Sequence, residues 1–322
     1  MMEPCPNIPQ LTVTVLKDPE AFREIKAEWN SLLQESEANN VFLSWEWMHT
    51  WWEIYGRNYQ LHTIAVRTPS GELVGIAPLK MAERGIQAIH KSQVLEFIGW
   101  GGDVTTEYLD IIARKGWEKS VFNSIAEHLF RNNTWTELDL HHFSSASAFI
   151  PFMKEYLEQR GLPCRIEKSS VCPIVVLPET WETFLSGKSP NFRKKSKEYR
   201  RTSQRDLDVR LVCCDSQATL DEHMDDLRDL HLKRWGWDSR AFRTSEYITF
   251  HRKVSGLFLQ NGWLRLFFLK QQGKTLAGIY CFHYNNRYYY YQSGRDKEYS
   301  KHRLGMVLLN EVLKEKGLFA VK

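Results

Sequence analysis

The chain has 322 residues, a mass of 38.0 kDa and a composition that is 43% hydrophobic and 25% charged, which excludes a disordered or fibrous protein and leaves room for two domains. The formal charge of +4 is too small to mark the whole surface as a site for nucleic acid. No apolar run is long enough to cross a membrane and the first residues lack a signal-peptide pattern, so we expect a cytoplasmic protein.

The first half of the chain mixes strands and helices. Leu11–Leu16 alternates as a strand, and Asp18 followed by Pro19 predicts a capped helix start. Ser44 begins a second helix, whose tryptophans form a stripe that is typical of a core. The other elements expected in this half are strands at 62–68, 73–80, 94–100, 108–113, 137–141 and 164–168, and helices at 117–131 and 147–161.

A long polar loop covers residues 99–107, and Asp103, Glu107 and Asp110 lie close together in sequence. Loops of this kind often line binding sites, so Asp103 and Asp110 are candidate substrate-binding residues. A solvated surface loop is the alternative interpretation. We expect the domain boundary after this half, which gives an N-terminal domain at 1–169 and a C-terminal domain at 170–322.

The second half begins with a strongly basic segment. Lys188 to Arg205 holds eight Lys or Arg residues against Glu198 alone, a local charge of +7, so the rest of the chain sums to −3. We expect a helix at 191–205, which is a solvated surface helix, a site for the phosphates of an acyl donor or an anionic sugar polymer, or a site for RNA phosphates. Around it we expect strands at 171–177 and 207–212 and helices at 178–185, 220–235 and 245–259.

The last part of the chain reads as three antiparallel strands followed by a helix. Strands are predicted at 264–270 and 275–284, and Asn285-Asn286 forms the turn into a third strand from Tyr288. By alternation, Tyr291 and Gln292 lie on opposite faces of that strand. A polar loop at 293–303 then leads into the helix. Free backbone N–H groups at such a helix start bind phosphate, although an ordinary strand-to-helix turn is the simpler interpretation.

This order of elements resembles the GNAT acyltransferase fold, and more closely the CelD-type (cellulose-biosynthesis) acetyltransferase-like family, a relative of the FemAB group. The resemblance implies an α/β (α+β) protein of tandem GNAT-like domains, each a mixed central sheet flanked by helices, with the second domain cut short at its C-terminus. The residues that carry it are Trp45-Glu46-Trp47, Trp51-Trp52, Tyr108-Leu109-Asp110, Asn191–Arg201, Leu230-His231, Arg234-Trp235, and Tyr291–Tyr299 leading to Gly305.

The resemblance also implies a site for acetyl-CoA or another acyl-CoA. Its pyrophosphate would lie on the backbone amides of the first helical turn, with two cations nearby; these residues are Leu304, Gly305, Met306, Lys301 and Arg303. The backbone donor for the oxyanion would come from the third strand, and the candidate acids are Tyr291, Ser293 and Tyr299. Trp235 is a candidate for binding the acceptor. The helix start keeps one glycine where the family usually has more, which leaves less room for a pyrophosphate.

We therefore expect an acyltransferase that acts on an amine or hydroxyl of a small molecule or sugar, in envelope or polysaccharide biosynthesis. The alternatives are a FemAB-like transferase that uses aminoacyl-tRNA, and a degenerate binding protein without turnover. The six scattered cysteines form no metal-binding pair, so we expect reduced thiols and no metal. A strand at 318–321 would end the chain at an open sheet edge, which predicts self-association through that edge and slow turnover.

Overall fold

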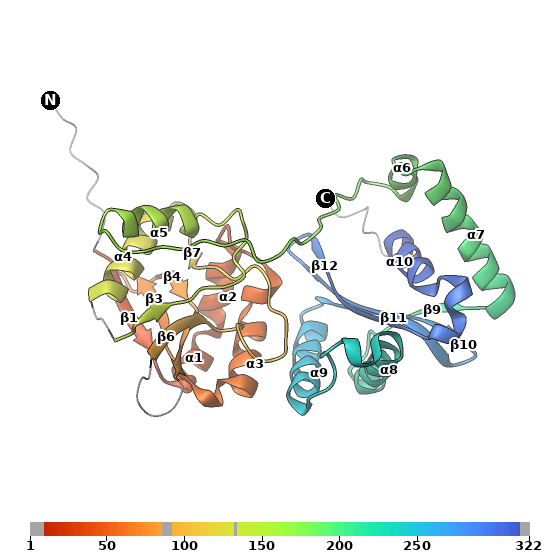
Figure 1. Ribbon diagram of the computed structural model, residues 1–322, viewed down its shortest axis with the longest axis horizontal. Helices are drawn as coiled ribbons and strands as arrows, with labels where there is room; N and C mark the ends of the chain where they lie inside the picture. The colour runs from red at the N-terminus through yellow and green to blue at the C-terminus, as the bar shows by residue number, and fades with distance from the viewer. Residues whose placement is uncertain (1–9, 86–91, 132–133, 316–322) are drawn as a thin grey trace. The chain divides into compact units, whose positions relative to one another are not determined.

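Both halves of the chain are built around β-sheets flanked by helices, which confirms the expected α/β class (Figure 1). The computed structural model describes residues 10–85, 92–131 and 134–315. The chain divides into two units, Met1–Ser170 and Val171–Lys322. Within the described ranges, no helix combines the length and the apolar content that crossing a bilayer requires.

The helices of the first unit begin where the sequence predicts. The Asp18 side chain accepts a hydrogen bond from the Glu20 N–H at the start of the first helix, and the Ser44 side chain caps the third. The helices are α1 Pro19–Glu24, α2 Lys26–Gln34, α3 Trp45–Tyr55, α4 Glu118–Arg131 and α5 Phe149–Glu158. The strands are β1 Thr12–Leu16, β2 Tyr59–Leu61, β3 Thr63–Arg67, β4 Leu73–Ala77, β5 Leu79–Arg84, β6 Ser92–Phe97, β7 Ile112–Ala113 and β8 Glu137–Leu138.

The tryptophans of α2 and α3 form the core of this unit, as the aromatic stripe predicts. Trp29, Trp47 and Trp51 are fully buried. The Trp29 indole N–H donates to the Leu43 carbonyl at 2.8 Å, and that of Trp47 donates to Thr106 Oγ1 at 3.1 Å. Partners of this kind remove the cost of burying an indole N–H, so the aromatic residues stabilise the unit.

The strands of the first unit form two four-stranded sheets, with the orders β1-β3-β4-β7 and β2-β5-β6-β8. The chain passes from one sheet to the other at His62, between β2 and β3, and at Pro78, between β4 and β5. Because Pro78 has no N–H to donate, it ends one strand, while its carbonyl accepts from Ile98 N–H at 2.8 Å. The pair β6–β8 is parallel and all the other pairs within these two sheets are antiparallel.

Two predicted strands are wrong, and others form only in part. Residues 162–178, which include the strands predicted at 164–168 and 171–177, form no helix or strand, and most are exposed. Ile174 and Val176 are 81% and 88% exposed. An alternating apolar pattern becomes a strand only where another strand supplies its hydrogen bonds, and none in the described part of the chain does. Of the strands predicted at 108–113 and 137–141, only Ile112–Ala113 and Glu137–Leu138 form.

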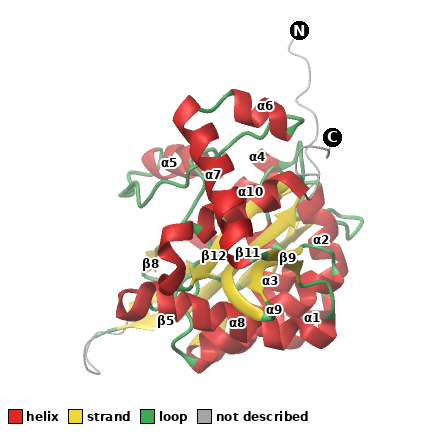
Figure 2. Ribbon diagram, turned by 90° about the vertical axis from the view of Figure 1, so that its right-hand side faces the viewer, coloured by secondary structure: helices red, strands yellow, loops and turns green. Residues whose placement is uncertain are grey.

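The second unit contains one antiparallel sheet with the order β12-β11-β10-β9. Helices α7 and α10 cover one face, and α8 and α9 cover the other (Figures 1 and 2). The helices are α6 Trp181–Ser186, α7 Pro190–Leu207, α8 Gln217–Trp235, α9 Ser245–Gln260 and α10 Leu304–Glu315, with short 3-10 turns η3 Gly236–Asp238 and η4 Lys297–His302. The strands are β9 Arg210–Cys213, β10 Leu264–Gln271, β11 Lys274–Tyr284 and β12 Arg287–Arg295.

The tight turns and the core of this unit follow from local sequence. Asn285 and Asn286 have φ of 47° and 54°, the left-handed pair that joins β11 to β12 without disturbing their twist. The face toward α10 is an apolar cluster formed by Leu207, Val209, Phe267, Leu269, Leu276, Ala277, Ile279, Cys281, Leu304, Val307, Leu308 and Val312. The strand predicted at 318–321, and the open edge expected there, lie outside the described residues.

Candidate active site

A β-bulge interrupts β12 at Tyr291. Tyr280 pairs with Gln292 and Cys281 pairs with Tyr290, so Tyr291 is an extra residue on β12. A bulge leaves a backbone group of the extra residue outside the ladder. The Tyr291 N–H lies next to the Cys281 thiol, which belongs to the apolar cluster under α10. Burial raises the pKa of this thiol to about 12, and the Tyr291 amide opposes the rise.

The bulge also corrects the predicted faces of β12. Alternation places Tyr291 and Gln292 on opposite faces, but both contact α9. The Tyr291 ring lies 5.1 Å from the His251 ring, and Gln292 Nε2 lies 3.4 Å from Tyr247 Oη. Side chains of a regular strand alternate between its two faces, and the extra residue of the bulge interrupts this alternation.

The start of α10 presents free backbone donors to an open space. Arg303 has a left-handed backbone, and its carbonyl accepts from the N–H groups of Met306 and Val307 at 2.9 and 3.2 Å. The amides of Leu304 and Gly305 are therefore the first-turn donors available to a ligand. A Cβ placed on Gly305 would meet only Arg295 Cδ, at 4.0 Å. The first turn of α10 is therefore open beside Gly305.

Cations surround this helix start. Lys301 and Arg303 are exposed and form no ion pair with any residue that the structure describes. Asp296, in the loop before α10, is buried and accepts from the Glu298 N–H at 3.0 Å and from Lys233 Nζ at 3.2 Å. Burial alone would raise the pKa of Asp296, but these partners hold it below its usual value, so the loop keeps one internal negative charge while its outer cations stay free.

The three candidate acids contact different groups. The Tyr291 ring packs with the rings of His251, Tyr280 and Phe282. The Tyr299 hydroxyl lies 3.3 Å from Lys274 Nζ. Ser293 Oγ accepts a 2.6 Å hydrogen bond from Arg234 Nη1, so its own proton remains available to donate.

His231 and Arg234, which carry part of the resemblance but were not expected as site residues, are neighbours of the candidate site. His231 Nδ1 lies 3.2 Å from the Ser293 carbonyl, which can only accept, so Nδ1 carries the proton and Nε2 accepts from Ser239 Oγ at 2.9 Å. Burial lowers the pKa of His231 and the nearby arginines lower it further, although the bond to Ser293 opposes this. The signal was their spacing of three on α8, which places both on one side of a helix.

The predicted acceptor residues lie in both units. Trp235 ends α8, and the Arg234 guanidinium lies 4.5 Å from its ring centre. In the first unit, Asp103 accepts from the Tyr55 hydroxyl. Asp110 is buried and accepts from Ser147 Oγ at 2.8 Å, and burial raises its pKa to about 6. Within the described residues, no three His, Cys, Asp or Glu side chains are placed to share a metal ion.

Comparison with known proteins identifies the second unit's domain type. Residues 190–315 match the model of the "Acetyltransferase (GNAT) domain" family, so this part of the chain is a GNAT-type acetyltransferase domain. No curated protein matches the chain.

Two solved structures share the fold at low sequence identity. FemX is 10% identical, with a TM-score of 0.58 over 89% of this chain and 83% of its own. A conserved protein of unknown function from Bacteroides thetaiotaomicron VPI-5482 is 11% identical, with a TM-score of 0.50 over 95% of this chain and 88% of its own. Both likenesses extend over most of the chain.

Proposed function

We propose that the second unit transfers an acyl group from acyl-CoA to an amine or hydroxyl. One observation carries this proposal. The Tyr291 amide at the bulge and the start of α10 both contact the same apolar cluster, on one face of the sheet. An acyl-CoA uses both groups. A backbone N–H stabilises the oxyanion that forms at the thioester carbonyl, and helix N–H groups bind the pyrophosphate of the same molecule.

Each group then has a role. The amides of Leu304 and Gly305 hold the pyrophosphate, and Lys301 and Arg303 add positive charge. Met306 contributes less, because its N–H already donates to the Arg303 carbonyl.

Ser293 is the favoured acid of the three candidates. It would give its hydroxyl proton to the leaving thiolate, and the charge of Arg234 would stabilise the serine oxygen that results. Tyr291 and Tyr299 are the weaker candidates, since one packs among rings on the α9 side and the other bonds to Lys274.

The acceptor class rests on the CelD-type resemblance. It favours an amino sugar or sugar hydroxyl used in envelope or polysaccharide synthesis in the cytoplasm. Trp235 supports this, because an aromatic face under a guanidinium can stack against a ring. Asp103 and Asp110 remain proposed substrate-binding residues within the first unit.

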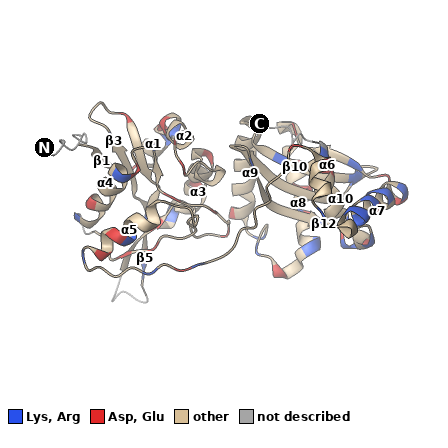
Figure 3. Ribbon diagram, turned by 90° about the horizontal axis from the view of Figure 1, so that it is seen from above, with Lys and Arg blue, Asp and Glu red and all other residues tan. Residues whose placement is uncertain are grey.

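A FemAB-like reaction with aminoacyl-tRNA is the second candidate. The exposed cations of α7 favour it (Figure 3). The fold shared with FemX agrees with the FemAB resemblance.

Calorimetry with acetyl-CoA tests the donor site. Gly305→Val places a branched side chain in the space left for the phosphate, and we expect it to abolish binding. Lys314→Val is the matched control, because it puts the same residue at an exposed position near the other end of α10. Equal affinity in both variants would show that acyl-CoA does not use this helix start.

Turnover assays separate the remaining alternatives. Acyl transfer that survives ribonuclease treatment supports the acyl-CoA reaction, whereas activity that needs charged tRNA supports the FemAB-like one. Binding of acetyl-CoA without transfer to amine or hydroxyl acceptors would identify a binding protein instead.

A further inference from the structure

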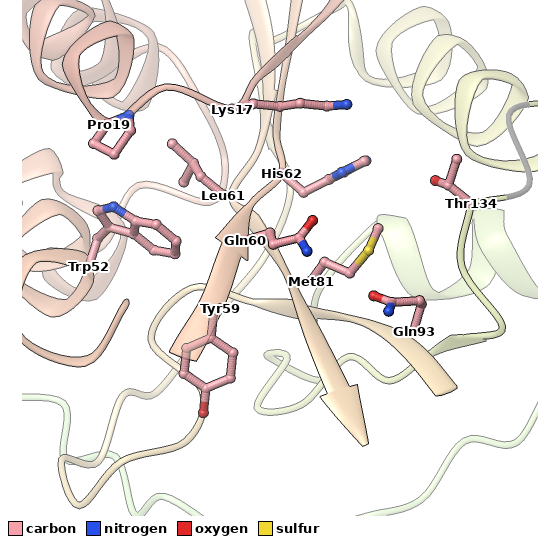
Figure 4. A pocket seen from close by; sticks show the side chains of 10 residues that line it. All are labelled: Lys17, Pro19, Trp52, Tyr59, Gln60, Leu61, His62, Met81, Gln93 and Thr134. Carbon is pink, nitrogen blue, oxygen red and sulfur yellow. The ribbon is translucent and has the colours of Figure 1, made fainter. Parts of the chain in front are cut away.

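The first unit contains a cavity of about 620 Å³ that the proposed acyl transfer does not use. Its volume lies within the range of about 300–1,000 Å³ that small-molecule sites occupy. Figure 4 shows the side chains that line it, which come from the end of β1, the start of α1, α3, the sheet β2-β5-β6 and the segment before β8. They are Lys17, Pro19, Trp52, Tyr59, Gln60, Leu61, His62, Met81, Gln93 and Thr134.

One side of the cavity carries positive charge. Lys17 and His62 extend side by side (Figure 4). Lys17 forms no ion pair with a residue in the described part of the chain. Burial lowers the pKa of His62 to about 4, and the charges of Lys17 and His128 add to this. His62 is therefore a neutral polar group at physiological pH, and Lys17 is the cation of the lining, which contains no Asp or Glu.

The side of the cavity opposite Lys17 contains a hydrogen-bond acceptor that no donor satisfies. Gln93 Nε2 donates to Glu83 Oε1 at 3.3 Å, which leaves Gln93 Oε1 as the free end of the amide. This oxygen is buried and has no hydrogen-bond partner among the described residues. A buried carbonyl oxygen without a partner is costly, and a rotation of the Gln93 side chain would turn it toward the cavity, where a ligand hydroxyl supplies the missing donor. Gln60 and Thr134 add polar groups that can bond to further hydroxyls.

The rest of the lining is flat or apolar. Trp52, Leu61 and Met81 give the cavity surfaces that pack against carbon-bound hydrogens. A ligand that satisfies the whole lining needs several hydroxyls, a ring with an apolar face and one negative charge for Lys17. Fatty acids lack the hydroxyls, and a bare phosphate leaves the apolar surfaces uncovered.

We propose that this cavity binds a monosaccharide that carries one anionic group, a phosphate or a carboxylate. The anionic group lies at Lys17, a ring hydroxyl donates to Gln93 Oε1, and the ring packs on Trp52. The proposal concerns the first unit alone and holds whether or not the second unit transfers acyl groups.

Calorimetry on the full chain tests it with four probes: glucose 6-phosphate, glucuronate, glucose and inorganic phosphate. We expect at least one of the two anionic sugars to bind about tenfold more tightly than glucose or phosphate, since a charge-assisted hydrogen bond contributes about that factor. The tighter of the two identifies the anionic group.

Three variants locate the binding. Lys17→Gln should weaken the anionic sugar about tenfold and leave glucose unchanged, because only the charge is lost. Gln93→Leu should weaken both sugars. Lys119→Gln, at an exposed lysine of α4 outside the lining, should change neither. The proposal is overturned if neither anionic sugar binds more tightly than glucose and phosphate, or if Lys17→Gln and Gln93→Leu bind like the unaltered protein.

Discussion

Asp110 is a buried carboxyl whose burial outweighs its hydrogen bonds. Ser147 Oγ and the Ile111 N–H both donate to it, yet its pKa is raised from 3.8 to about 6. The folded protein therefore keeps a proton on Asp110 between about pH 4 and pH 6, where the unfolded chain has released it. Stability must fall as pH rises through this window, since the unfolded state binds fewer protons.

Asp110→Asn should remove this loss. We expect the variant and the unaltered protein to be about equally stable near pH 4, and the variant to gain up to about 3 kcal/mol in free energy of unfolding by pH 7. Urea unfolding followed by tryptophan fluorescence measures both. Glu24→Gln, at an exposed carboxylate of the same unit, is the control and should show no such gain. A gain of the same size at both pH values would mean that packing, and not ionisation, is responsible.

Tyr291 shows what sequence at the residue scale cannot reveal. The caps Asp18 and Ser44 and the turn at Asn285-Asn286 depend on their own neighbours, and all three are predicted correctly. The bulge depends on how β12 pairs with β11, because nothing in the run of four tyrosines states which residue is the extra one. The most informative backbone group of the candidate site is therefore found only in the structure.

At the scale of elements, α8 packs directly on β12 at Gly294. A Cβ at this position would lie 2.4 Å from the backbone nitrogen of His231 and 2.4 Å from the carbonyl carbon of Leu230. Backbone atoms of a helix cannot move aside as a flexible side chain can. The contact explains why the strand carries glycine here, two residues after Gln292.

We expect Gly294→Ala to destabilise the protein by at least about 2 kcal/mol, as overpacking in a close contact does. Gly256→Ala in α9 is the control, since its Cβ would meet nothing closer than 3.6 Å, and alanine favours a helix. Chemical unfolding of both variants compares them. Similar stability in the two would show that α8 can shift away from the strand at little cost.

The basic helix α7 has both a packed side and a solvated side. Asn310 Nδ2 donates to Ser196 Oγ at 2.8 Å, and Arg200 pairs with Glu311 at 2.8 Å, so one side packs on α10. Arg193 donates to the carbonyls of Ser186 and Lys188 and holds the turn after α6. The solvated side carries cations without an ion pair to any described residue; they are Lys194, Lys195, Lys197 and Arg201.

Replacing Lys194, Lys195 and Lys197 by Gln should weaken binding of bulk tRNA and flatten its salt dependence. Each phosphate contact contributes about 0.7–0.9 to the slope of log affinity against log salt, so the loss of three should lower the slope by about 2 to 3. Filter binding from low to high salt measures the slope. An Arg165→Gln, Lys168→Gln double variant, which changes cations outside α7, should keep it. If the slope does not change in the triple variant, α7 is an ordinary solvated helix.

For the whole molecule, the segment at 162–178 is the accessible link in the chain. It has no secondary structure and is largely exposed, and it contains Arg165 and Lys168. Proteases require an extended, exposed backbone of about this length. We expect brief trypsin treatment to cut first at these two residues and to give two folded fragments.

Mass spectrometry and circular dichroism of the digest check this expectation. The Arg165→Gln, Lys168→Gln variant should resist the first cut. If cleavage within α7 precedes cleavage at 165 and 168, the link is more protected than its exposure indicates.

The two strands predicted in this link are wrong, and they show what residue patterns cannot predict about the whole molecule. The Val-Cys-Pro-Ile-Val-Val-Leu run at 171–177 has strong β propensity, but propensity describes a residue's fit to a sheet and cannot supply the neighbouring strand. In contrast, β10, β11 and β12 are predicted because each finds its partner across a short turn. Sequence predicts local pairing well and distant pairing poorly.

Ser196 and Asn310 form a hydrogen bond although they are 114 residues apart in the chain. This separation affects the order in which the second unit folds during synthesis. A ribosome releases α7 long before α10, so Leu207 must wait for its partners Leu304 and Leu308 while most of the second unit is synthesised. The two hairpins of β10, β11 and β12 close over short loops and need no such wait. We therefore expect the nascent second unit to begin folding at its hairpins, with α7 held in solution by its own charge until α10 emerges.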